Sequence, residues 1–284
     1  MDKGFAPAKV NLALHVTGLG ADGYHQLDSL VVFAGTGDQI TATPSRELSL
    51  TVGGPFAPGV PTDETNLVLR AARILRDARG VEKGAVIRLT KNLPHGAGIG
   101  SGSSDAAATL KLLAKLWNVE PLAADAPEVL SLGSDVPVCL RAPAPARMRG
   151  RGEVIETLPP LPSLGLILVN PGTSLPTRDV FQALATKENP PLPDLPKVGK
   201  AEDFAAWLRM VRNDLQAPAE TLAPPVKDAL DLLRRTPGVL AAVMSGSGAT
   251  CVGITKDAGS ARTAARIIQV ARQAWWVAPA PMLA

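Results

Sequence analysis

The chain has 284 residues, of which 46% are hydrophobic and 19% charged, and its formal net charge at pH 7 is +3. This composition is typical of a globular protein with two domains or one large domain. The slight charge argues against a nucleic-acid-binding protein, which would need basic residues clustered on one face. The lack of a run of about 18 apolar residues argues against a membrane span.

Two features bear on location and assembly. The N-terminal residues lack the charged-then-apolar layout of a signal peptide. Cys139 and Cys251 have no Cys-x-x-Cys partner and are expected to be reduced thiols. We therefore expect a cytoplasmic protein, and a monomer because no extra apolar surface is evident.

The N-terminal third predicts strands around one helix. Apolar and polar residues alternate over residues 8–17, which predicts a strand with an apolar back and a polar front that carries Lys9. A glycine-rich turn leads to a second strand over 24–34, so a hairpin is expected. A helix opens at Asp63 and ends at Gly80. Further strands are expected at 38–43, 47–52 and 84–90.

A glycine-rich loop follows the last of these strands. Four glycines and three serines lie between Gly96 and Ser104, and an apolar helical pattern begins at once. Such a loop exposes backbone N–H groups at the positive end of a helix dipole, where a phosphate is favoured. Ser103 or Ser104 is expected to cap the helix. The loop has neither the lysine of a P-loop nor the setting of a dinucleotide-binding turn, so alone it indicates only a phosphate site.

The C-terminal part predicts an antiparallel sheet layered with helices. A boundary is expected near Pro159, followed by a buried strand at 164–169. The order β-α-α-α-β-β-α-β predicts the α+β class. The helices are expected at 177–185, 201–212, 225–235 and 257–273, and the strands at 239–244, 250–255 and 275–278. Before the boundary, a short helix at 125–133 and a hairpin at 147–158 with solvated arginines (Arg141, Arg147, Arg149 and Arg151) are expected.

Four segments carry candidate chemistry, in this order: Pro7–Leu12, Pro94–Ala107, Ser134–Pro137 and Ser245–Thr250. Taken singly, each has an ordinary explanation, such as a solvated lysine, a turn-forming aspartate or a glycine hairpin. Together they resemble the GHMP family of small-molecule kinases, which includes galactokinase, homoserine kinase and mevalonate kinase. The resemblance covers essentially the whole chain and extends to Ala21-Asp22-Gly23-Tyr24-His25, Asn66-Leu67, Pro171-Gly172, Pro176-Thr177, Phe181 and Asn213-Asp214-Leu215. Ile99, Ser101 and Ser134 depart from the residues more usual at those positions.

The resemblance implies a two-domain GHMP kinase fold. Residues 1–160 would form an N-terminal domain like domain 2 of ribosomal protein S5, which binds ATP and carries the catalytic residues. Residues 161–284 would form a ferredoxin-like C-terminal domain. ATP would be the phosphoryl donor, and Mg²⁺ is expected to accompany it, with no residue assigned as its ligand.

The resemblance also implies residue roles. Asp135 would be the general base toward the acceptor hydroxyl, and Lys9 would lie beside it and the transferring phosphoryl group. These roles are physically reasonable, because phosphoryl transfer needs positioning and positive potential, and a nearby lysine keeps a carboxylate ionised. The ATP-binding residues would be Asn66, Leu67, Pro94, Gly96, Ala97, Gly98, Ile99, Gly100, Ser101, Gly102, Ser103 and Ser104.

The acceptor site rests on the resemblance as well. The resemblance is strongest to family members that phosphorylate the 2-hydroxyl of a cytidine diphosphate-linked methylerythritol in the non-mevalonate isoprenoid pathway. Tyr24 and Phe181 would sandwich the cytosine, His25 would read its edge, and Asn11 and Thr177 would complete the acceptor site. The alternatives are a mevalonate- or homoserine-type acceptor, or a non-catalytic ligand-sensing protein of the same fold.

Overall fold

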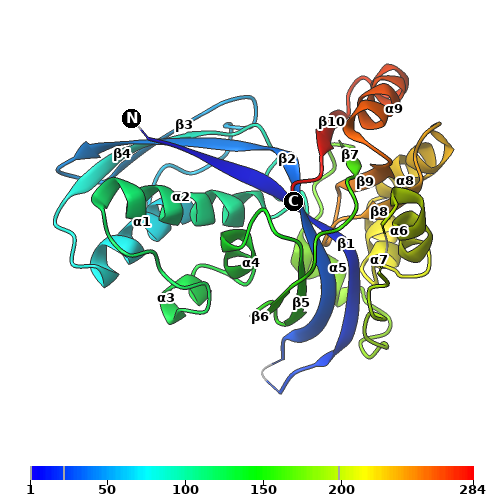
Figure 1. The fold of residues 1–284 in the computed structure, drawn as a ribbon, viewed down its shortest axis with the longest axis horizontal. Helices are drawn as coiled ribbons and strands as arrows, with labels where there is room; N and C mark the ends of the chain where they lie inside the picture. The colour runs from blue at the N-terminus through cyan, green and yellow to red at the C-terminus, as the bar shows by residue number, and fades with distance from the viewer. Residues whose placement is uncertain (1, 22, 198) are drawn as a thin grey trace. The chain divides into compact units, whose positions relative to one another are not determined.

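The structure, a computed structural model, describes residues 2–21, 23–197 and 199–284. Asp22, part of one predicted motif, lies outside the described residues. Helices and strands are mixed throughout, which confirms the predicted α+β class (Figure 1). The chain divides into two compact units, each made of separate segments. The first unit contains the residues up to Ala8, Gly37–His95 and Gly100–Ala142, and the second contains Lys9–Thr36, Gly96–Ile99 and Pro143–Ala284.

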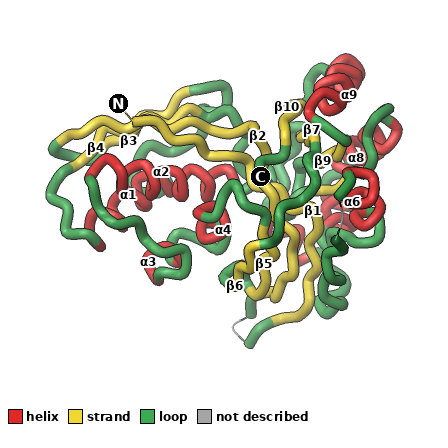
Figure 2. The backbone as a smooth tube through the Cα atoms, in the orientation of Figure 1, coloured by secondary structure: helices red, strands yellow, loops and turns green. Residues whose placement is uncertain are grey.

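The first unit packs helices against a small sheet. Strand β4 (Gly84–Thr90) pairs antiparallel with the end of β2 (His25–Ser45) and parallel with β3 (Ser49–Gly53). Helices α1 (Leu67–Ala78) and α2 (Ser101–Trp117) pack together beneath these strands in the view of Figures 1 and 2, and α2 also packs against α4 (Val136–Leu140). The short helix α3 (Pro127–Leu130) completes this unit.

Helix α2 starts earlier than predicted. Its first residue is Ser101, and the cap position is Gly100, whose φ of 56° lies in the left-handed region. Neither Ser103 nor Ser104 caps the helix, so that prediction was wrong. A glycine at this φ costs no steric strain, which lets the helix begin directly at the end of the loop.

Strand β2 is one continuous element of 21 residues, not the two strands predicted. Gly37, which lies between the two predicted strands, allows close packing within the continuous strand. A Cβ atom at Gly37 would collide with the carbonyl oxygen of Ala6. The backbone of β1 (Asp2–Leu19), which pairs with β2 as the hairpin prediction required, therefore approaches too closely for any side chain there.

The second unit contains a four-stranded antiparallel sheet in the order β10-β7-β9-β8. Helices α8 and α9 pack against these strands, which gives the β-α-β-β-α-β pattern of a ferredoxin-like domain. Leu230, Leu233, Ile268 and Val169 lie in the shared core. The strands are β7 (Gly165–Asn170), β8 (Ala241–Met244), β9 (Cys251–Thr255) and β10 (Trp276–Pro281), and the helices are α5 (Thr177–Gln182), α6 (Ala201–Leu208), α7 (Gln216–Leu222), α8 (Pro225–Arg235) and α9 (Ala258–Ala271).

The first part of β2 belongs to the second unit and pairs with β5 (Ala146–Gly150), which pairs in turn with β6 (Val154–Thr157). The expected hairpin is confirmed, but its arginines are not all solvated. Arg147 donates two hydrogen bonds to the buried carboxylate of Asp28, at 2.8 and 2.7 Å, and one to the carbonyl of Leu192. A sequence pattern cannot reveal this ion pair, since its members lie 119 positions apart.

Two short helices, α4 and α7, escaped prediction because each contains a proline. Pro137 and Pro218 lie in the first turn of their helices, where no backbone N–H is required. The polar front predicted for β1 is also not exposed, because Lys9, Asn11 and His15 are all buried.

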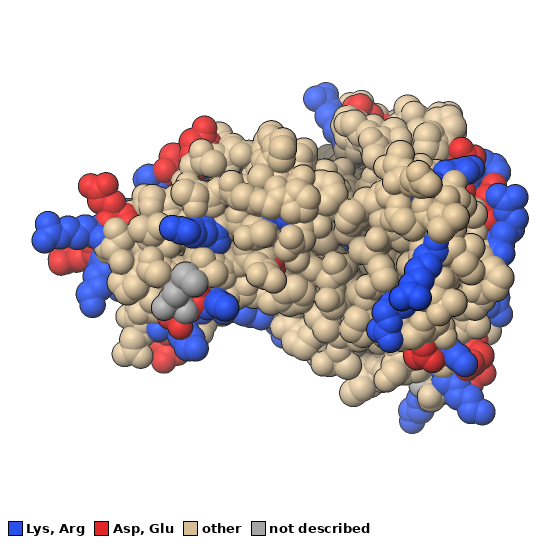
Figure 3. Space-filling view, turned by 90° about the horizontal axis from the view of Figure 1, so that it is seen from above, with Lys and Arg blue, Asp and Glu red and all other residues tan. Residues whose placement is uncertain are grey.

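Among the described residues, no helix is long and apolar enough to cross a lipid bilayer. On the face shown in Figure 3, basic and acidic side chains are interspersed and wide areas carry neither.

Candidate active site

The two glycine-rich stretches that stood apart in the sequence meet in the second unit. A Cβ atom at Gly98 would lie 2.6 Å from the carbonyl oxygen of Gly248, and one at Gly246 would lie 2.8 Å from that of Gly98. The Ser245 hydroxyl donates to the Gly98 carbonyl at 2.9 Å, and the Thr250 N–H to that of Ala97 at 3.2 Å. The backbone of the loop therefore lies against the hairpin formed by Ser245 to Thr250.

Strand β1 brings Lys9 and Asn11 to the same place. The Lys9 N–H donates to the carbonyl of Ile99 at 3.0 Å, and the Asn11 N–H to the Ser245 hydroxyl at 3.1 Å. The Asn11 amide nitrogen donates to Ser29 Oγ, but its oxygen Oδ1 is buried without a hydrogen-bond partner. An unsatisfied buried acceptor is costly, so this atom is suited to receive a hydrogen bond from a ligand hydroxyl.

Polar residues of the second unit hold the hairpin. The Asn213 side chain donates to the carbonyls of Met244 and Gly246, at 2.9 and 2.7 Å. Thr177 Oγ1 and Ser247 Oγ lie 2.8 Å apart, which places this predicted acceptor residue at the hairpin. The sequence marked Asn213 only as part of a motif. Its amide nitrogen thus ties two carbonyls at the start of the hairpin to one side chain.

Two of the three residues predicted to recognise the cytosine, His25 and Phe181, are in contact. The rings of His25 and Phe181 are 4.9 Å apart between centroids, at an interplanar angle of 31°. His25 Nε2 is buried and has no hydrogen-bond partner. Burial, and to a lesser extent the charge of Lys187, lowers the pKa of His25, so its ring is neutral at pH 7. Residue Tyr24 is 56% exposed, and the guanidinium carbon of Arg151 lies 4.1 Å from the centroid of its ring.

In the first unit, the start of α2 presents backbone N–H groups. Those of Ser101, Gly102 and Ser103 have no intrahelical acceptor, because an α-helix leaves its first N–H groups unpaired. Leu67 lies beside this turn, with its Cδ1 3.5 Å from the position of a Cβ on Gly102. The structure thus brings together Leu67 and the end of the predicted phosphate loop, while Pro94 is half-buried at the loop's entrance.

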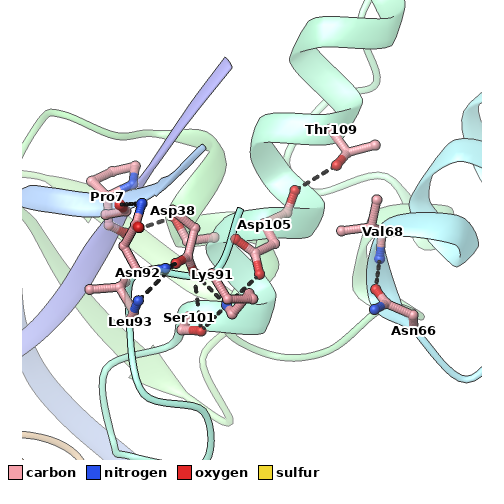
Figure 4. A network of polar contacts seen from close by, with 12 residues as sticks. Pro7, Asp38, Asn66, Val68, Lys91, Asn92, Leu93, Ser101, Asp105 and Thr109 are labelled. Atoms are coloured by element: carbon pink, nitrogen blue, oxygen red, sulfur yellow. Dashed lines mark hydrogen bonds and ion pairs between the residues drawn. The ribbon is translucent and has the colours of Figure 1, made fainter. Parts of the chain in front are cut away.

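The side chain of Asn66, a predicted ATP-binding residue, forms hydrogen bonds within the first unit. Its Oδ1 accepts the N–H of Val68 at 2.8 Å and caps α1 (Figure 4). Its amide nitrogen donates to the carbonyl of Pro61 at 2.6 Å. The Ser104 hydroxyl is engaged as well, since it donates to the carbonyl of Pro7 at 2.7 Å.

A buried charge cluster beside the loop was missed by the sequence analysis. The Lys91 ammonium pairs with Asp38 and donates to Ser101 Oγ at 2.5 Å and to Asp105 Oδ2 at 2.7 Å (Figure 4). Desolvation is the main cause that raises the pKa of Asp105 to about 7, with repulsion from Asp38 adding to it and attraction by Lys91 opposing it. No pattern signalled this cluster, because a lysine after a strand and an aspartate near the start of a helix are common surface features.

Asp135 is half-buried in the first unit, at the residue before α4, and its carbonyl accepts the N–H of Cys139 at 3.1 Å. Lys9 belongs to the second unit. Within the described ranges, no cluster of three or more His, Cys, Asp and Glu side chains is arranged to hold a metal ion.

Two family models match this chain. The model for the N-terminal domain of GHMP kinases matches residues 66–142, and the model for their C-terminal domain matches residues 192–271. The chain belongs to the GHMP kinase family, and is thus an ATP-dependent kinase of small molecules with the two-domain fold of that family.

Individual proteins similar to this chain are named for particular reactions within the family. A protein of Cereibacter sphaeroides named 4-diphosphocytidyl-2-C-methyl-D-erythritol kinase is 52% identical over 284 residues, which cover 99% of each chain. A crystal structure of 4-(cytidine 5'-diphospho)-2C-methyl-D-erythritol kinase matches with a TM-score of 0.81, 32% identity and full coverage of both chains. Homoserine kinase from Cytophaga hutchinsonii shares the fold, with a TM-score of 0.70 at 18% identity over 99% of this chain and 94% of its own.

Proposed function

We propose that the chain transfers the γ-phosphoryl group of ATP to the 2-hydroxyl of 4-diphosphocytidyl-2-C-methyl-D-erythritol, a step of the non-mevalonate isoprenoid pathway. The observation that carries this acceptor is the His25–Phe181 pair, in which a neutral imidazole leaves a buried Nε2 unpartnered beside an aromatic face. A pyrimidine offers both a face to stack on and hydrogen-bonding edges. Full-length relatives named for this reaction support the same acceptor.

In the proposed mechanism, Asp135 accepts the proton of the acceptor hydroxyl while its oxygen attacks the γ-phosphorus, and the bond from the γ-phosphorus to the bridging oxygen breaks so that ADP leaves. Lys9 supplies positive charge toward the transferring group, and Asn11 Oδ1 accepts a hydrogen bond that orients the hydroxyl. The N–H groups of the loop from Gly96 to Ser104 receive the phosphate oxygens. Mg²⁺ arrives with ATP as part of the substrate. This division of work suits phosphoryl transfer, in which positioning and charge stabilisation dominate.

The first test measures the reaction directly. The purified chain is incubated with MgATP and 4-diphosphocytidyl-2-C-methyl-D-erythritol, and ADP release and the mass of the product are followed. Mevalonate and homoserine are offered in parallel. Of the three acceptors, we expect only the cytidine compound to be phosphorylated. Turnover with mevalonate or homoserine instead would assign a different acceptor, and nucleotide binding without any turnover would favour a sensing protein.

Replacement of the proposed base tests the mechanism. Asp135→Asn keeps the size of the side chain but cannot accept the proton, so kcat is expected to fall by roughly 10²- to 10⁴-fold. Asp125→Asn, at an exposed position of the same unit, is the matched control and should retain parental kcat. Equal activity of the two variants would remove Asp135 from the mechanism.

A substitution of His25 tests the proposed recognition of the cytidine acceptor. His25→Ala removes the unpartnered nitrogen and the ring that lies against Phe181, and should raise the KM for the cytidine acceptor about 10-fold or more. The KM for ATP should change less than twofold. A rise in the KM for ATP of the same size would show that His25 acts on the fold or on the nucleotide, and would contradict the cytosine assignment.

A further inference from the structure

The buried cluster of Asp38, Lys91, Ser101 and Asp105 touches both ends of the glycine-rich loop. At the entrance, Asp38 Oδ1 accepts the backbone N–H groups of Asn92 and Leu93, at 2.6 and 2.9 Å. At the exit, the Lys91 ammonium donates to Ser101 and Asp105 in the first turns of α2. In Figure 4 these side chains converge from β2, the end of β4 and the start of α2.

The cluster is unusual for its burial and charge. Lys91 is 2% exposed, and the side chains of Asp38 and Asp105 are 0% and 4% exposed. Two carboxylates therefore share one ammonium away from water, and Asp105 Oδ1 has no hydrogen-bond partner. Such an arrangement adds little stability over apolar packing, because desolvation offsets most of the attraction between the charges. Its directional hydrogen bonds, however, fix the geometry of the segments that they join.

Ser101 connects the cluster to the proposed phosphate site. Its hydroxyl accepts from Lys91, while its own backbone N–H is one of the unpaired groups at the start of α2. The hydroxyl also lies 3.4 Å from Asp38 Oδ2, to which it can donate. The orientation of the first helical turn is thus tied to the ammonium by one short hydrogen bond.

We infer that Lys91 is a positioning residue for ATP: held between Asp38 and Asp105, it fixes Ser101 and the start of α2 so that the backbone N–H groups of this turn face the phosphates. Lys91 makes no contact with the nucleotide in this inference. The inference rests on the proposed placement of the ATP phosphates at the loop.

The test measures binding of a non-hydrolysable ATP analogue with Mg²⁺ by calorimetry, without acceptor, on the full chain. Ser101→Ala removes only the tied hydroxyl and keeps every charge, and should weaken binding about 5-fold, the effect of losing one hydrogen bond. Lys91→Met should weaken binding by more than 10-fold. Unchanged affinity in both variants would overturn the inference.

A third variant separates positioning from stability, because Lys91→Met leaves two buried carboxylates uncompensated and can prevent folding. The triple variant Asp38→Asn, Lys91→Met, Asp105→Asn removes all three charges. It should recover thermal stability while its affinity for the analogue remains weakened more than 10-fold. Recovery of both stability and affinity would show that the cluster serves the fold alone.

Two controls complete the design. Arg147→Met with Asp28→Asn removes an ion pair of the second unit whose carboxylate is buried and whose arginine side chain is 16% exposed, and should leave nucleotide affinity within twofold of the parent. Gly102→Asp tests the loop itself, because an acidic residue in the first turn favours the helix but repels phosphates. If Gly102→Asp binds the ATP analogue as tightly as the parent does, the assignment of the loop as the phosphate site fails. If only Gly102→Asp loses affinity, the role of Lys91 fails while the loop assignment stands.

Discussion

At the scale of single residues, two buried polar atoms of the second unit stand out because they have no hydrogen-bond partner. Asn11 Oδ1 and His25 Nε2 are buried polar atoms without partners, and both belong to residues that the sequence had marked for the acceptor. In folded proteins nearly all buried polar groups are paired, so such exceptions indicate places where a ligand completes the hydrogen bonding. Their proposed roles thus gain support that their residue types alone could not provide.

Asp105 should make stability depend on pH. Its pKa is raised in the folded state to about 7 and is near 3.9 when unfolded, so folding favours the protonated form. Its contribution is fully present below pH 4 and is lost as pH rises to about 7. Asp105→Asn should remove this decline and raise the free energy of unfolding above pH 7 by on the order of 2–4 kcal/mol. Urea unfolding at pH 5, 6, 7 and 8 measures the effect.

An aspartate with the opposite shift is the control for this prediction. The Ser260 N–H holds the pKa of Asp257 below its ordinary value. Any contribution of Asp257 is therefore present above pH 4, so Asp257→Asn should leave the slope of stability between pH 5 and 8 unchanged. If Asp105→Asn also leaves this slope unchanged, the carboxyl group of Asp105 does not titrate in that range.

At the scale of elements, the decisive feature is the packing of the 96–99 loop on the Ser245–Thr250 hairpin. The sequence marked both stretches as glycine-rich, but the glycine pattern does not say that the two meet. Gly98 has a φ of +74°, and any side chain there would collide with carbonyl oxygens of the hairpin. Glycine is required at this position by close backbone approach as well as by conformation.

Gly98→Ala should therefore be strongly destabilising. We expect the free energy of unfolding to fall by roughly 2 kcal/mol or more, since strain at positive φ and a backbone clash act together. Gly18→Ala is the matched control in the same unit, because Gly18 has no heavy atom within 4 Å of an added Cβ. Chemical denaturation measures the free energy of unfolding of both variants. Similar decreases for the two would contradict the close packing of Gly98 on the hairpin.

At the scale of the whole molecule, the family fold implies that nucleotide binding stabilises the folded chain. A non-hydrolysable ATP analogue at 100 times its Kd should add about 2.7 kcal/mol to the free energy of unfolding, and so raise Tm by several degrees. Asp135→Asn should show the same shift, because the proposed base acts on the acceptor. A shift that disappears in Asp135→Asn would place this residue in nucleotide binding instead.

Most of the secondary structure and the family could be predicted from the amino-acid sequence. Period-2 and helical patterns predicted most strands and helices, including α8 and β4 to the residue, because local periodicity reports directly which faces are buried. The four spaced segments were sufficient to indicate the GHMP kinase family, which the comparisons confirm. The residue roles carried over from that family remain proposals.

The long-range contacts could not be predicted in this way. The continuity of β2, the Arg147–Asp28 pair and the Lys91 cluster depend on contacts between residues tens of positions apart, which no local pattern encodes. The same holds for the loop, whose glycines predicted an anion site but not the hairpin against which it packs. Local propensity determines which elements form, whereas long-range packing determines which polar groups are buried, paired or left for a ligand.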